Sequence, residues 1–441
     1  MGSDYDVVAH GIGGAKDLPI PPELAIAGAV AALTISFTVL ALAWRQPRFD
    51  TASGRPAPAW LSRLVEAPGF LVGLRVLGFA VFTFSMAAAI FGEDSLINPF
   101  FGMFYVVLWV GLVPLSVLFG PFYRAISPVR TINKLFAKIS GSDPVEGIFD
   151  YPDWLGRWPA ALGLYAFVWM ELVYPFSNQL GPVRLWFATY VAVMLVGGAL
   201  FGNRFYANAD PFEVYSTLAG HLSFFARRDG RLVLISPMAN LAGVRPTPGL
   251  VAVVGVLFGS TAFDSFKDSN VWLTHTQSWD ISPLLLNNIA LLVFCATVGL
   301  LFGLATAATG IHDGQPRWLL PSQYAHSMVP IIVGYITAHY LTYLVFEGQQ
   351  TLQQASDPFS TGADWFGTAD LKVNYWLSYH GTLVATIKVA GVVIGHVLGV
   401  VAAHDRAVAL LPKRHQLTGQ LPLLFVMVGF TISGLYLLFA A

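Results

Sequence analysis

The chain has 441 residues, of which 55% are hydrophobic and 11% are charged, and its net charge at pH 7 is −1. Soluble globular domains carry about 25% charged residues, so this composition excludes an ordinary soluble fold and predicts a protein with several membrane spans. The nearly neutral net charge gives no sign of a nucleic-acid partner, and we expect none.

The N-terminal stretch MGSDYDVVAHGIGGAKDLPIPPE lacks a basic segment followed by an apolar core. We therefore expect no cleavable signal peptide, and residues 1–22 should form an external N-terminal segment. The first apolar run would then act as its own insertion signal.

Ten apolar runs follow, and each approaches the roughly 20 residues that a spanning helix needs. They lie near 23–44, 69–92, 100–119, 158–177, 183–203, 247–263, 283–308, 324–346, 381–402 and 418–440. The single cysteine, Cys295, lies in the seventh run, where we expect a small core residue. The sequence predicts an all-α integral membrane protein whose residues 23–441 form one transmembrane domain.

Basic residues predict the orientation of these helices. The connections 45–68, 120–157, 203–246, 309–323 and 403–417 together hold 18 Lys and Arg residues, whereas the opposite side holds four. Positive loops face the cytoplasm, so both termini should lie outside, in a multi-pass plasma-membrane protein.

Two cytoplasmic connections, 120–157 and 203–246, carry amphipathic helical patterns. In PVRTINKLFAKIS (128–140), apolar residues recur at helical spacing opposite basic residues, which favours a helix lying on anionic inner-leaflet lipid. Docking of a protein partner is the alternative. Asp210 before Pro211 and Glu213 predicts a helix start, and Asp229-Gly230 predicts a tight turn.

The longest external connection, 347–380, mixes glycine, proline, acids and aromatic residues. Loops of this length usually have a function, and we expect a folded cap over the outer mouth. Two five-helix halves would have to be inverted relative to each other, as in many secondary transporters.

Several polar and ionisable residues lie within the predicted spans, where a charge costs roughly 2.5–3.5 kcal/mol and usually marks function. At about 1.5 Å per residue, most of them fall in the outer third of the membrane. We expect them to line an outward-facing cavity that binds a proton or a small solute: Glu171, Asp264, Asn287, Asn288, His339, Lys388 and, deeper, His396.

His339 should have Glu171 or Lys388 as its partner in that cavity, and its imidazole could exchange protons near neutrality. Packing against neighbouring tyrosines is the structural alternative, as is a buried Glu171–Lys388 ion pair. The segment GSTAFD (259–264) ends the short sixth span, and such a glycine-interrupted end can unwind beside a cavity.

A divalent metal is one candidate cofactor. Glu171, His339 and Asp264 could hold it, and His326 with His404 form an alternative inner site. A bis-histidine haem is not expected, because His339 and His396 differ in depth by about 12 Å.

Five segments together resemble a group of actinobacterial multi-pass membrane proteins often labelled hypothetical fenitrothion hydrolases. These segments are ADPFEVYS (210–217), FGSTAFDSF (258–266), AHYLTYLVFEGQ (338–349), SDPFSTGADWFGTAD (356–370) and GHVLGVVAAHDRAVAL (395–410). The resemblance covers most of the chain, implies phosphotriester hydrolysis, and draws attention to His339, His396, His404 and Asp405. Lys388 departs from the group, where an uncharged residue is expected.

Three functions follow from these observations. The first is a proton-linked transporter or permeation protein for a small molecule or ion. The second is a membrane-embedded hydrolase of lipophilic esters in which a metal ion activates water. The third is a non-catalytic membrane subunit that docks a protein partner through its basic cytoplasmic loops.

Overall fold

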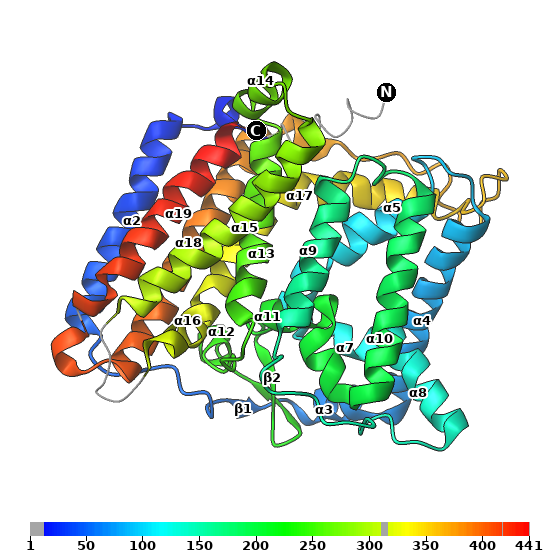
Figure 1. Ribbon diagram of the computed structural model, residues 1–441, viewed down its shortest axis with the longest axis horizontal. Coiled ribbons are helices and arrows are strands. Elements are labelled where there is room, and N and C mark those ends of the chain that lie inside the picture. The colour runs from blue at the N-terminus through cyan, green and yellow to red at the C-terminus, as the bar shows by residue number, and fades with distance from the viewer. Residues whose placement is uncertain (1–12, 310–315, 417, 441) are drawn as a thin grey trace. The chain divides into compact units, whose positions relative to one another are not determined.

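The computed structural model describes residues 13–309, 316–416 and 418–440 (Figure 1). Within these residues, eight helical segments are long and apolar enough to cross a membrane. They are α2 (Pro22–Ala43), α4 (Pro68–Phe91), α10 (Leu180–Ala209), α13 (Leu250–Lys267), α15 (Pro283–Ala307), the segment Arg317–Gln354 that contains α16 (Leu320–Tyr324) and α17 (Met328–Gln354), α18 (Gly381–Leu410), and the segment Thr418–Phe439, which covers all but the last residue of α19 (Leu421–Ala440). A helical protein with many membrane spans is therefore confirmed.

The third and fourth predicted spans differ from regular membrane-length helices. The third consists of α5 (Pro99–Phe101), a π-helical stretch (Gly102–Val110) and α6 (Leu112–Phe119), and it bends by 42°. The fourth is α9 (Trp158–Leu172), whose 15 residues are fewer than the roughly 20 that span the hydrocarbon core. The count of ten spans and the external position of both termini therefore stay predictions, and residues 1–12 of the predicted external segment lie outside the described residues.

Contacts divide the chain into two compact units. Unit 1 comprises residues 1–53, 237–343 and 375–441, and unit 2 comprises residues 54–236 and 344–374. The first span, α2, thus belongs with the later helices and packs against α18 and α19. The units are not two successive five-helix halves, and a single transmembrane domain stays a prediction.

In unit 1, small residues allow α13 and α15 to approach closely. A Cβ added at Gly259 would lie 2.5 Å from the Cα of Cys295, and one at Gly255 would lie 3.0 Å from its carbonyl oxygen. Glycines four residues apart commonly permit such packing between membrane helices. Cys295 is a buried core residue, as expected. The segment GSTAFD is helical in the structure, since α13 continues to Lys267.

Unit 2 contains the helices predicted in connections 120–157 and 203–246. The amphipathic helix is α8 (Pro128–Ser140), and the helix that begins after Asp210 is α11 (Pro211–Gly220). Strands β2 (Phe225–Arg228) and β3 (Arg231–Leu234) form a hairpin, and β1 (Arg55–Pro56) pairs with the other edge of β3. Asp229 and Gly230 both have positive φ angles, 50° and 78°, as a two-residue hairpin turn requires.

The helix α10 breaks at Gly202, whose φ of 62° and ψ of −152° are non-helical. Glycine is required there both by the positive φ and by the close carbonyl oxygen of Val145. After this break Phe205 and Tyr206 lie against Gly197 and Gly198 of the preceding turns. Asn203 and Glu213 are there bound by Arg130 of α8.

The first eight residues of the predicted cap, 347–354, belong to a longer helix, since α17 extends to Gln354. The following segment of unit 2 is held by hydrogen bonds. Asp357 accepts from the backbone of Thr361 and Gly362, and the hydroxyl groups of Ser356 and Thr368 lie 2.7 Å apart. Residues 356–368 are thus held by hydrogen bonds within the connection, and a cap over the outer mouth stays a prediction.

Candidate functional site

A network of hydrogen-bonded polar side chains links α13 and α17 within unit 1. We call it the His339 network, and its members are Asp264, Ser265 and Lys267 of α13 and Tyr335, His339 and Tyr340 of α17. Tyr335 and His339 are four residues apart, and Asp264 and Lys267 are three apart, so each pair shares one face of its helix.

Asp264 is the acceptor at the centre of this network. Its Oδ2 lies 2.9 Å from His339 Nε2 and accepts a 2.6 Å hydrogen bond from the hydroxyl of Tyr340. Its Oδ1 forms a 3.1 Å ion pair with Lys267. Asp264 is only 3% exposed, and these partners compensate its negative charge. A buried carboxylate without such partners would be strongly destabilising.

The other ring nitrogen of His339 lies beside Ser265. The Ser265 hydroxyl is 3.1 Å from His339 Nδ1, 3.0 Å from the Tyr335 hydroxyl and 3.2 Å from the carbonyl oxygen of Thr261. When His339 is neutral with its proton on Nε2, the serine hydroxyl can donate to Nδ1. When His339 is an imidazolium, Nδ1 can donate to the serine oxygen while the hydroxyl donates to Thr261. The hydrogen bonds are therefore satisfied in both charge states of the imidazole.

Exposure differs along the network. The side chain of Lys267, at the C-terminal end of α13, is 26% exposed, whereas those of Asp264 and His339 are 4% and 6% exposed. Lys267 therefore connects the buried pair to the surface of unit 1.

Other residues predicted to line the cavity have different partners in unit 1. Lys388, 2% exposed, interacts electrostatically with Asp17. Asn287 accepts a 2.9 Å hydrogen bond from the indole of Trp272, on α14 (Asn270–Ser278). Asn288 donates to the carbonyl of Leu284 on its own helix. The structure thus brings together Asp264 and His339 from the predicted set.

Glu171 belongs to unit 2, where it lies on α9 and interacts electrostatically with Tyr105 and Tyr215. His339 makes hydrogen bonds with Asp264 and Ser265, and the expected partnership with Glu171 or Lys388 stays a prediction.

The other three histidines of the predicted sites, His326, His396 and His404, make hydrogen bonds within unit 1. His396 Nδ1 lies 2.8 Å from the Val392 carbonyl, and His326 Nδ1 lies 3.1 Å from that of Gln323. His404 uses both ring nitrogens, towards Gln420 and the backbone of Trp44. Among the described residues, no three His, Cys, Asp or Glu side chains are grouped to hold a metal ion, and the metal sites named from the sequence stay predictions.

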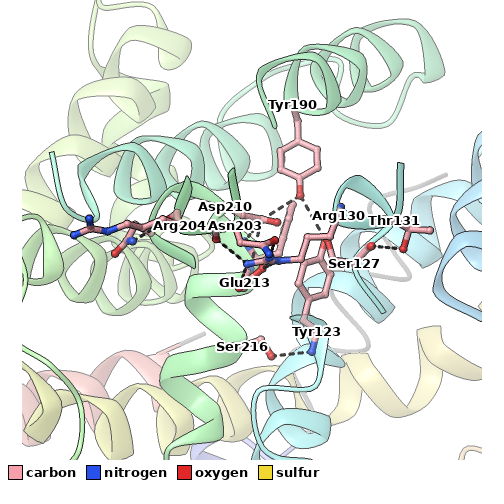
Figure 2. Close-up of polar contacts among 12 residues, drawn as sticks. Tyr123, Ser127, Arg130, Thr131, Tyr190, Asn203, Arg204, Asp210, Glu213 and Ser216 are labelled. Atoms are coloured by element: carbon pink, nitrogen blue, oxygen red, sulfur yellow. Dashed lines mark hydrogen bonds and ion pairs between the residues drawn. The ribbon is translucent and has the colours of Figure 1, made fainter. Parts of the chain in front are cut away.

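A second buried cluster lies in unit 2, and Figure 2 shows how its side chains converge. We call it the Arg130 cluster, and it consists of Arg130 of α8, Asn203 and Asp210 at the end of α10, Glu213 of α11, and the nearby Tyr123, Tyr190 and Tyr206. The guanidinium of Arg130 binds both carboxylate oxygens of Glu213, at 2.5 and 2.7 Å, and also binds the side-chain and backbone oxygens of Asn203. It lies 4.9 Å from the centre of the Tyr206 ring, a cation–π distance.

Asp210 holds the start of α11. Its Oδ1 accepts hydrogen bonds from the backbone N–H groups of Phe212 and Glu213 and from the hydroxyl of Tyr190, as an N-cap residue does. Its Oδ2 is buried and has no hydrogen-bond partner among the described residues. Burial, together with the nearby charge of Glu213, raises the pKa of Asp210 to about 7, although the hydrogen bonds on Oδ1 lower it in part.

The sequence pattern around Asp210 predicted the helix start but not the Arg130 cluster. Aspartate followed three residues later by glutamate is typical of a capping box, in which the glutamate returns to the N-cap backbone. Glu213 instead binds Arg130, which is 83 residues away in the chain. Nothing in the local spacing could indicate that partner.

A scan against protein-family models finds no match for this chain. Comparison with curated proteins gives no significant match. Comparison with solved structures likewise gives none.

Proposed function

We propose that the protein is a proton-linked transporter or permeation protein, in which His339 and Asp264 carry the proton. The observation that supports this most strongly is the position of Ser265, which can donate to or accept from His339 Nδ1. A group that takes up and releases a proton inside a membrane needs hydrogen-bond partners in both charge states, since an unsatisfied polar group costs several kcal/mol there.

Two further features support a proton pathway over a purely structural network. Ionisable side chains within membrane spans often form proton relays in pumps and transporters. In addition, Lys267 joins the buried Asp264–His339 pair to a partly exposed position, so the pair has a route for charge exchange with water.

The test is a pH jump applied to the full-length protein in proteoliposomes on a solid-supported membrane, with the charge movement recorded as a transient current. The wild type should give a current that His339→Gln and Asp264→Asn reduce at least about ten-fold. His275→Gln is the matched control, because His275 is an exposed histidine of α14 whose Nδ1 bonds the carbonyl of Val271 and whose ring contacts Trp279, outside the His339 network. Ser265→Ala, which removes a single oxygen, should slow the current even if the larger changes impair folding. Equal currents in the wild type, His339→Gln and Ser265→Ala would refute the proposal.

The same geometry favours a second candidate function, a membrane-embedded hydrolase of lipophilic esters. Ser265, His339 and Asp264 form a continuous Ser–His–Asp arrangement, with distances of 3.1 and 2.9 Å. Such arrangements are recognised by geometry and not by order in the chain. However, Ser265 is fully buried, and it lies inside α13, where the backbone N–H groups bond within the helix, so its own backbone does not offer the N–H donors that commonly stabilise the oxyanion in acyl transfer.

A fluorophosphonate probe distinguishes the two candidates, because it reacts with an activated serine. The transporter proposal predicts no covalent labelling of Ser265 in the reconstituted protein. Labelling that is lost in Ser265→Ala, together with hydrolysis of a nitrophenyl ester, would favour the hydrolase.

A further inference from the structure

The amphipathic helix α8 exposes much of its apolar surface. Leu135, Phe136 and Ile139 are 49%, 57% and 83% exposed, whereas Val129 and Ala137 are buried. A helix on a globular protein normally turns its apolar stripe towards the core. Here a second apolar face is left outside unit 2.

The Arg130 cluster determines this orientation of α8. The side chain of Arg130 is 11% exposed and that of Glu213 is 3% exposed. Rotating α8 to bury Phe136 and Ile139 would withdraw Arg130 and leave Glu213 as an unpaired buried charge, which is strongly unfavourable. The ion pair therefore holds the apolar face outward.

The charges and the position of α8 indicate what covers this face. The helix contains Lys134 and Lys138, both exposed, and no acidic residue. It packs beside the membrane-length helices α4 and α10 (Figure 1), and its basic connection belongs to the predicted cytoplasmic side. Exposed apolar side chains continue in the following segment, at Ile148, Phe149 and Trp154.

We propose that α8 is a docking surface for anionic phospholipid of the inner leaflet. Leu135, Phe136 and Ile139 enter the boundary between headgroups and acyl chains, and Lys134 and Lys138 contact the lipid phosphates. Amphipathic helices with basic polar faces bind membranes in this way. The surface is independent of the His339 network and of the function proposed for it.

The test places a bimane fluorophore at Ile139→Cys in full-length protein whose native cysteine is replaced, Cys295→Ser. Ser142→Cys, an exposed polar position just beyond α8, is the matched control. Liposomes contain equal amounts of phosphatidylcholine and phosphatidylglycerol, and either lipid carries bromine atoms that quench a fluorophore in contact with its acyl chains. Brominated lipid should quench the label at residue 139 several-fold more than the label at residue 142.

Lipid preference is measured in the same samples. Brominated phosphatidylglycerol should quench the label at residue 139 more than brominated phosphatidylcholine does. Each lysine near an anionic surface contributes about 1 kcal/mol, or about five-fold in local lipid preference. Lys134→Gln with Lys138→Gln should therefore remove the preference, whereas Lys372→Gln, an exposed lysine in the predicted external connection, should leave it unchanged.

Three results would overturn the proposal. The first is the absence of quenching by either brominated lipid. The second is equal quenching by the two lipids with the lysines intact. The third is a blue-shifted label that brominated lipid does not quench, because this would show that a second copy of the chain or another protein covers the face.

Discussion

Replacing Asp210 with asparagine removes a carboxyl group whose charge the Arg130 cluster does not fully compensate. Arg130 forms its ion pair with Glu213, and Asp210 has three hydrogen-bond donors on Oδ1 and none on its buried Oδ2. Asparagine keeps an oxygen for those donors and replaces Oδ2 with a neutral amide group. The substitution therefore resembles the protonated form of Asp210.

The expected magnitude follows from the pKa of Asp210, which burial raises from 3.8 to about 7. A carboxyl whose folded pKa exceeds its unfolded pKa binds its proton more tightly in the folded state. Its favourable contribution is complete below pH 3.8 and is lost as the pH rises towards 7. A shift of three units corresponds to about 4 kcal/mol, so Asp210→Asn should be more stable than the wild type at pH 8 by up to that amount and similar to it near pH 4.

The assay is thermal unfolding of the full-length protein in lipid nanodiscs between pH 4 and pH 8, followed by tryptophan fluorescence. The difference between Asp210→Asn and the wild type should grow as the pH rises and level off above pH 7. Asp153→Asn is the control, because the Asp153 side chain is 86% exposed and surface ion pairs contribute little. A variant that is less stable than the wild type at pH 8 would show that the ionised carboxylate stabilises the cluster, and it would refute the charge balance described above.

Three further predictions concern other parts of the chain. Arg130→Gln alone should lower the free energy of unfolding by about 3–5 kcal/mol, because it leaves the buried charge of Glu213 unpaired. The double variant Arg130→Gln with Glu213→Gln should lose less stability in the same unfolding assay. Equal losses in the two variants would contradict this prediction. Gly259→Val should prevent stable folding, because its Cβ would lie 2.5 Å from the backbone of α15. Gly303 has open space around it, so Gly303→Val is the control. In size-exclusion chromatography Gly303→Val should elute as the wild type does, and Gly259→Val should not. Backbone hydrogen bonds lower the pKa of Asp357, so its turn should become more sensitive to limited proteolysis as the pH falls through that pKa, and Asp357→Asn should remove this pH dependence.

Hydropathy predicted most of the membrane-length helices, because the tendency of an apolar run to enter lipid depends only on the residues of that run. It was less informative for the third and fourth runs. The bend between Val110 and Leu112 depends on π-helical hydrogen bonding, in which the N–H of Gly111 bonds the carbonyl of Val106. The shortness of α9 depends on where the chain leaves the helix at Leu172. Hydropathy does not show either feature, although Pro114 lacks the N–H that would bond the Val110 carbonyl and is therefore a local sequence signal for the bend.

The helix cap at Asp210 and the turn at Asp229-Gly230 were also predictable, because each depends on residues that are close together in the chain. Asp210 acts on backbone groups two and three residues away, and Asp229-Gly230 forms a turn from its own φ preferences. The orientation of α8 was not predictable, since it depends on the contact between Arg130 and Glu213. The periodic pattern shows that the helix has an apolar stripe, but only the long-range ion pair decides which side faces the protein.

The sequence identified His339 and Asp264 separately, as polar groups at one depth, and the structure joins them. Depth alone could not choose among the polar residues of five helices, because rotation about each helix axis decides which side chains meet. The close approach of α13 and α15 at Gly259 and the ring position of His339 against Ser265 are properties of three-dimensional packing. A histidine within a membrane span thus predicts that a polar partner exists. The identity of that partner, and therefore the chemistry, depends on how each helix is rotated against its neighbours, which the sequence of one helix does not determine.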